Sequence, residues 1–179
     1  MIDIKYSFEW VFIFCITFNI WGQTKGDYYN LSSDYIESIF YDGEGKLWIG
    51  TDEGLNLITG HDQFKFLANT SDEKGLLDSE IFKLHDLKNG NLAAFSINGL
   101  SIFNPNEFNF KQIELKSKPV SIYFDINTDS YWITTEESGI VVLDTKFEIK
   151  KRFSFDPLNP LSVSSSRYTG ENKIVFNNQ

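Results

Sequence analysis

Two histidines are the side chains best suited to proton transfer in this sequence. His61 lies in a predicted turn between Gly60 and Asp62, and His85 ends a predicted strand beside Asp86. A histidine next to an aspartate can move a proton, but nucleophilic catalysis also needs a serine or cysteine that this base activates. No serine or cysteine stands in a matching context. We therefore expect surface roles for both histidines and assign no catalytic residue.

Two acidic segments are the nearest approach to a metal-binding loop. Residues 42–45 read Asp-Gly-Glu-Gly, and residues 125–130 read Asp-Ile-Asn-Thr-Asp-Ser. A calcium loop of the helix-loop-helix type needs the order Asp-x-Asp-x-Asp-Gly, which neither segment has. Glycine, aspartate and asparagine at these positions are typical of hairpin turns. The sequence thus predicts two turns, no metal ligand, and no residue that binds any other cofactor.

Aromatic side chains offer a third kind of chemistry, the stacking of a sugar ring. Aromatic residues make up 16% of the sequence, and several tyrosines cluster near its beginning. The candidates for an exposed stacking surface are Tyr28, Tyr29, Tyr35 and Tyr41. This hypothesis comes from composition alone, and unchanged ligand affinity after substitution of Tyr35 and Tyr41 would remove it.

The elements that must position these residues come from an internal repeat. The stretch 42–55, which contains Leu47-Trp48-Ile49-Gly50-Thr51, recurs about 45 residues later as 89–103 and again around 131–143. A repeat of this length built from short strands is typical of a β-propeller blade. We predict an all-β fold of four-stranded antiparallel blades, in a partial ring of about three and a half blades.

Within the first copy, the pattern predicts strands at 36–41, 46–50, 55–58 and 64–67, with Gly54 at positive φ. No window has apolar residues at helical spacing for three turns, so we expect almost no helix. Continuous apolar runs in the inner strands indicate burial on both faces. Trp48 and Trp132 should then lie in the core between blades. Ala93 replaces the tryptophan in the second copy, which predicts looser packing there.

The beginning of the chain carries an apolar run at residues 10–21, preceded by Lys5 and followed by Gly22. Twelve residues are too few to cross a bilayer as a helix, which needs about 20. The run suits a secretory signal peptide at 1–22, and an N-terminal core strand is the alternative. Cleavage would remove Cys15, the single cysteine. The net charge of −9 argues against nucleic acid and anionic membrane surfaces as partners.

At these positions the sequence resembles the two-component regulator propeller repeat. The first copy matches the family pattern almost throughout, from Leu31-Ser32 through Asp42 and 47–51 to Gly54-Leu55. The second copy departs from it at residues 93–96. The resemblance covers about residues 31–179.

Proteins with such repeats include hybrid sensor histidine kinases of Bacteroidota, in which the propeller is periplasmic and often detects carbohydrate fragments. The resemblance therefore implies a non-catalytic, periplasmic sensory region that binds an oligosaccharide or another small ligand and contacts other domains of a parent sensor. No kinase is present, and a membrane would be reached only through further segments downstream. An exported propeller enzyme, such as a lyase or hydrolase, and a secreted protein-binding scaffold are the alternatives.

The expected organisation is a signal peptide at 1–22 followed by a partial propeller at 23–179. The blades are placed at about 31–70, 76–115, 118–155 and 161–179, of which the last is incomplete. A closed propeller needs about 4–8 blades, so we interpret this chain as the N-terminal piece of a longer protein or as the product of a truncated gene. Self-association into a closed ring is a further possibility.

Overall fold

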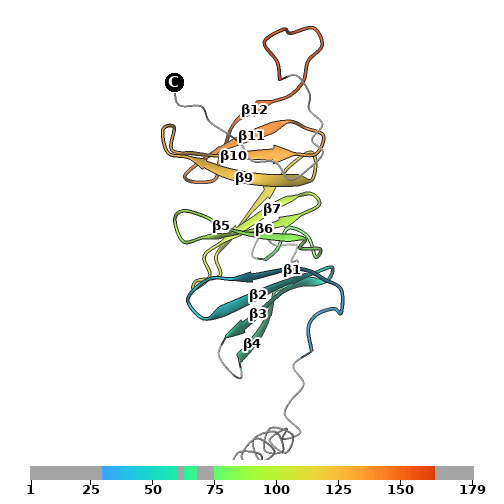
Figure 1. Cartoon of the computed structure of the whole chain (residues 1–179), viewed down its shortest axis with the longest axis vertical. Helices are drawn as coiled ribbons and strands as arrows, with labels where there is room; N and C mark the ends of the chain where they lie inside the picture. Colours follow the sequence, from blue (N-terminus) through green and yellow to red (C-terminus); the bar gives the residue numbers. More distant parts are fainter. Residues whose placement is uncertain (1–29, 60–62, 68–74, 164–179) are drawn as a thin grey trace, which may run out of the picture. The chain divides into compact units, whose positions relative to one another are not determined.

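A computed structural model describes residues 30–59, 63–67 and 75–163 of this chain of 179 residues. These residues form three antiparallel sheets of four strands each, which follow one another in chain order (Figure 1). The first sheet contains β1 (Ile36–Tyr41), β2 (Lys46–Thr51), β3 (Gly54–Thr59) and β4 (Gln63–Leu67). The second contains β5 (Lys83–Asp86), β6 (Leu92–Ser96), β7 (Gly99–Phe103) and β8 (Phe110–Glu114). The third contains β9 (Pro119–Asp125), β10 (Ser130–Thr135), β11 (Ile140–Asp144) and β12 (Ile149–Phe153).

In each sheet the strands pair with their neighbours in sequence, so every sheet is a simple meander. The first strands of the first two sheets, β1 and β5, also contact each other. This is the arrangement of propeller blades around an axis, and the predicted fold class is confirmed. Gly54 has φ of 145°, as predicted. The described residues contain no helix, and hence none long and apolar enough to span a membrane.

The first and second blades share a buried apolar core. Trp48 is fully buried, and its ring lies 5.2 Å from the ring of Phe103 and 6.2 Å from that of Phe108. Around it lie the buried apolar residues Leu55, Leu57, Leu76, Ile81, Leu84, Leu92 and Ala94. Because side chains alternate along a strand, Leu92 and Ala94 face the first blade while Ala93 and Phe95 face the third. Burial on both faces explains the unbroken apolar runs.

The second and third blades share a core of different composition. Ala93 is fully buried here, and no tryptophan stands beside it. Phe95 on the same face and Tyr131 on the opposite blade supply large side chains to this core, and both are buried. In this core the large aromatic side chains therefore lie at Phe95 and Tyr131, and not at the position of Ala93.

Trp132 lies in a different environment from Trp48 within the described residues. It is half-buried and stacks on Phe153 of the same sheet, with ring centroids 5.6 Å apart and an angle of 13° between the planes. Since Tyr131 and Ile133 face the second blade, alternation turns Trp132 to the other face of the third sheet. The prediction is therefore confirmed for Trp48. For Trp132, on the face of the third sheet turned away from the second blade, a place between blades stays a prediction.

Candidate functional site

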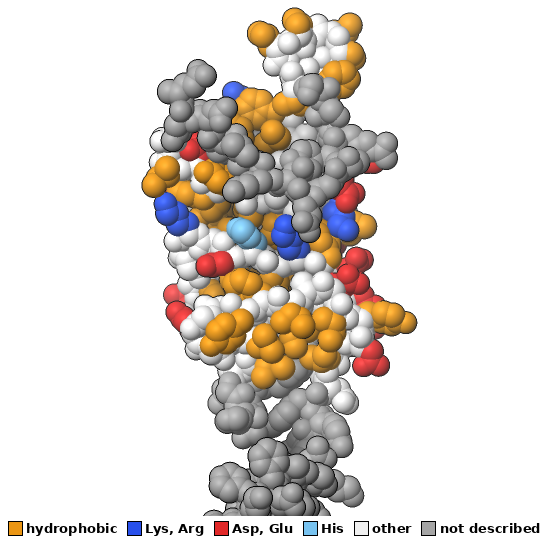
Figure 2. Space-filling view, viewed as in Figure 1, with side chains coloured by type: hydrophobic (Ala, Val, Ile, Leu, Met, Phe, Trp, Pro, Cys, Tyr) orange, Lys and Arg blue, Asp and Glu red, His pale blue; other side chains and the backbone are white. Residues whose placement is uncertain are grey.

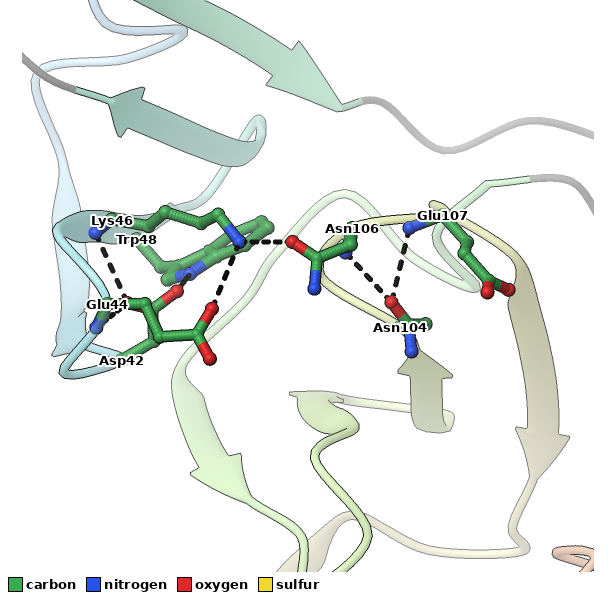
Figure 3. Close-up of polar contacts among 7 residues, drawn as sticks. All are labelled: Asp42, Glu44, Lys46, Trp48, Asn104, Asn106 and Glu107. Carbon is green, nitrogen blue, oxygen red and sulfur yellow. Dashed lines mark hydrogen bonds and ion pairs between the residues drawn. The ribbon is translucent and has the colours of Figure 1, made fainter.

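The turns at one end of the blades form a polar network between the first two blades (Figure 3). Lys46 donates from Nζ to Oδ1 of Asn106, 2.5 Å away in the turn between β7 and β8. Trp48 donates from its indole Nε1 to Oδ2 of Asp42 at 3.3 Å. The turn after β1 thus orients the buried tryptophan through Asp42, and Lys46, the first residue of β2, reaches the next blade.

In these turns, side-chain oxygens accept hydrogen bonds from nearby backbone N–H groups. Asp42 accepts hydrogen bonds at Oδ1 from the backbone N–H groups of Glu44 and Lys46, at 2.8 and 3.2 Å. Asn104 accepts in the same way from Asn106 and Glu107 (Figure 3). Such local bonds let a short side chain close a turn.

Residues 125–130, the other predicted turn, are closed by the same kind of local hydrogen bond. Asp125 accepts from the backbone N–H of Asn127 at 3.0 Å and from the hydroxyl of Thr128 at 2.5 Å. The Thr128 hydroxyl is the leading cause of the lowered pKa of Asp125. The structure therefore places both acidic segments in hairpin turns. Nowhere in the described ranges do three or more metal-binding side chains gather.

Asp144 also accepts hydrogen bonds from backbone N–H groups in its turn, those of Lys146 and Glu148. The pH dependence of stability can test what these bonds contribute. Hydrogen bonds, first from the Glu148 backbone N–H and then from Lys150, lower the pKa of Asp144 from 3.8 to about 2. A carboxylate with a lowered folded pKa stabilises the fold above its unfolded pKa, and this contribution is lost as pH falls through the folded pKa. We expect Asp144→Asn, which keeps the accepting oxygen, to unfold at lower urea than wild type at about pH 5, with the gap closing toward pH 2. A gap that does not change with pH would contradict this.

The two candidate proton-transfer residues are His61 and His85. His61 lies outside the described residues. Partial burial lowers the pKa of His85, the charge of Lys83 adds to this, and Asp86 opposes it. The Asp86 carboxylate lies in the adjacent position of β5, but the described part of the chain contains no hydrogen bond that joins His85 to a serine or cysteine.

The aromatic surface proposed for sugar stacking is partly present. Tyr35 and Tyr41 are 72% and 62% exposed, as are large parts of Ile36 and Ile39 beside them. Figure 2 shows hydrophobic side chains gathered over the first sheet. Tyr28 and Tyr29 lie outside the described residues, and a role in binding for Tyr35 and Tyr41 stays a prediction.

A groove between the second and third blades was not anticipated. It has a volume of about 330 Å³. It is lined by Lys88, Asn89, Phe124, Ile126, Asp129, Tyr131 and Thr145. These residues come from the β5–β6 turn on one blade, and from β9, β10 and two turns on the other. No pattern in the sequence indicated this groove, because its lining comes from two blades that only the fold brings together.

The sequence and structure were compared with known proteins. The family model described as "Two component regulator propeller" matches residues 30–53. The resemblance to two-component regulator propellers is confirmed. Among curated proteins, none matches this sequence significantly.

Two solved structures are similar to this chain. One is described as the extracellular domain of a hybrid two component system from B. thetaiotaomicron, with 26% identity and a TM-score of 0.57 over 76% of this chain. A second extracellular domain from that organism, described as part of a one component system, is 18% identical with a TM-score of 0.59 over 79% of this chain. This chain spans only 17% and 19% of those two domains. The second likeness, at low identity, concerns the fold alone.

Proposed function

We propose that this chain is part of the sensory propeller of a two-component signalling system, that it lies outside the cytoplasm, and that it binds a ligand rather than turning it over. The observation that carries the proposal is that a family model and a solved structure both match this chain. The first blade fits the regulator propeller repeat, and 76% of the chain aligns with an extracellular sensor domain. The other domains of the parent sensor, downstream of this chain, would be its partners.

The signalling step would be a change in how the propeller packs against its neighbouring domain. A ligand shifts such an equilibrium only by the difference between its affinities for the two states. Contacts such as the hydrogen bond from Lys46 to Asn106 link neighbouring blades. A ligand held by two blades at once could therefore favour one arrangement of those blades. An oligosaccharide is the ligand class that the family resemblance favours.

Export is the part of this proposal that can be tested directly. Alkaline phosphatase becomes active only where its disulfides form, outside the reducing cytoplasm. Fused after Gln179, it should be active in cells, and deletion of residues 2–22 should abolish this activity at equal protein level. Equal activity of both fusions, or none from either, would contradict export through residues 1–22.

The alternative, an exported propeller enzyme, can be tested by looking for product after the chain is incubated with its ligand. Fold alone does not determine function, since propellers carry many chemistries. The purified chain should bind its ligand without product formation on prolonged incubation. Product that accumulates with time and enzyme concentration would favour the lyase or hydrolase alternative.

A further inference from the structure

Two Asn-Gly pairs occur in this sequence, Asn89-Gly90 and Asn98-Gly99. Asparagine before glycine is prone to spontaneous deamidation, because glycine has no Cβ to keep the asparagine side chain away from the following backbone nitrogen. Both asparagines are exposed, and both lie in turns of the second blade, the first between β5 and β6 and the second between β6 and β7. Residue type and exposure therefore give the two sites the same expected reactivity, and only their surroundings in the fold distinguish them.

Asn89 is held only by hydrogen bonds within its own turn. Its Oδ1 accepts from the backbone N–H of Asn91 at 3.3 Å, and the N–H of Gly90 donates to the carbonyl of Leu87 at 3.0 Å. Gly90 has φ of 76°, and an added Cβ there would meet no atom within 4 Å. Since Asn89 and Gly90 are both exposed, local opening of this turn breaks these two bonds without uncovering a buried side chain, and such openings require little free energy.

Asn98 is tied to two other segments of its blade. Its Nδ2 and its backbone N–H donate to the two carboxylate oxygens of Asp78, at 2.9 and 3.0 Å, and its carbonyl accepts from the N–H of Leu115 at 2.8 Å. Gly99 is buried and is paired with the strands on both sides of β7. An added Cβ at Gly99 would lie 2.0 Å from the backbone oxygen of Ile113. The Asn98 side chain can therefore reach the Gly99 nitrogen only after paired strands separate.

We propose that Asn89 is a site of spontaneous deamidation in the folded chain, and that the fold protects Asn98 from the same reaction. The backbone nitrogen of Gly90 attacks Cγ of Asn89 and forms a new C–N bond. The bond from Cγ to Nδ2 breaks, and Nδ2 leaves as ammonia with the proton that the Gly90 nitrogen gives up. Water then opens the succinimide ring at one of its two carbonyls, which produces aspartate or isoaspartate at position 89.

The reaction changes the rim of the groove between the second and third blades, which Asn89 lines together with Lys88 and Asp129. Either product adds a negative charge next to Lys88. Isoaspartate also adds a methylene group to the backbone of the β5–β6 turn, which displaces the N–H of Gly90 from the carbonyl of Leu87. The charge and shape of this rim therefore change with the age of the molecule.

The test is peptide mapping by mass spectrometry after the full chain is incubated in mildly alkaline buffer, with and without urea. Each conversion replaces NH2 with OH, which changes the peptide mass, and chromatography separates isoaspartate from aspartate. In the folded chain we expect Asn89 to convert at least about tenfold faster than Asn98, since each factor of ten corresponds to about 1.4 kcal/mol of extra opening free energy. In urea the two rates should become similar, because both sites are then open.

Asn89→Gln is the matched control. It keeps the amide, but attack by the Gly90 nitrogen would need a larger ring, so conversion at position 89 should be lost while Asn98 behaves as in wild type. A cooperative urea transition in the same buffer establishes that the chain without urea is folded. The proposal is overturned if Asn98 converts as fast as Asn89 in the folded chain, or if Asn89 converts no faster than Asn109, which is not followed by glycine.

Discussion

Trp48→Ala is expected to lower the free energy of unfolding by about 3–5 kcal/mol. The indole is fully buried between two blades, against Phe103 and Phe108 of the second blade. Truncation removes these contacts and leaves a cavity that the paired strands on either side cannot close. It also leaves Asp42 without the hydrogen bond from Nε1. The effect should appear as a lower urea midpoint for unfolding of the whole chain.

Trp132→Ala is the control for this prediction. It removes the same side chain from the equivalent repeat position, but Trp132 is half-buried and packs on Phe153 within its own sheet. The cost should therefore be clearly smaller than for Trp48. Equal losses from the two substitutions would show that contact between blades is not what makes Trp48 costly to remove.

The contrast between these two tryptophans also marks the limit of what the sequence predicts. The repeat gave the strands, because apolar and turn residues recur at fixed positions: the predicted strand 36–41 coincides with β1. The repeat also predicts that position 48 is apolar on a buried face. It does not say which blade lies against Trp132, since that depends on the neighbour on the far side of the third sheet.

The turns were predictable for a local reason. Asp42 bonds to N–H groups two and four residues further on, so residue type and spacing alone indicate the contact. The groove was not predictable in this way. Its lining joins Lys88 of the β5–β6 turn to Phe124 and Tyr131 of the third blade, and only the fold brings these segments together. Such a surface depends on which segments of two sheets lie side by side, and residue type and local spacing do not specify that.

Gly139→Ala is the second substitution with a large expected effect. Gly139 lies in the turn between β10 and β11 with φ of 78°, a conformation that costs other residues about 1–2 kcal/mol. An added Cβ would also lie 2.0 Å from the backbone oxygen of Phe153, at the end of β12. Backbone in a paired strand cannot move aside as a flexible side chain can. Overpacking of this kind adds about 1–3 kcal/mol, so the total expected loss is about 2–5 kcal/mol.

Gly43→Ala separates these two contributions. Gly43 has φ of 79°, almost the same as Gly139, but an added Cβ there meets no atom within 4 Å. Its substitution should cost only the conformational part, about 1–2 kcal/mol. Urea unfolding gives the loss of stability in each variant. The loss in Gly139→Ala minus the loss in Gly43→Ala is the cost of the close contact between the β10–β11 turn and β12. If the two variants lose the same stability, the turn and β12 do not approach as closely as the structure has them, and the third blade is packed more loosely at its outer strand.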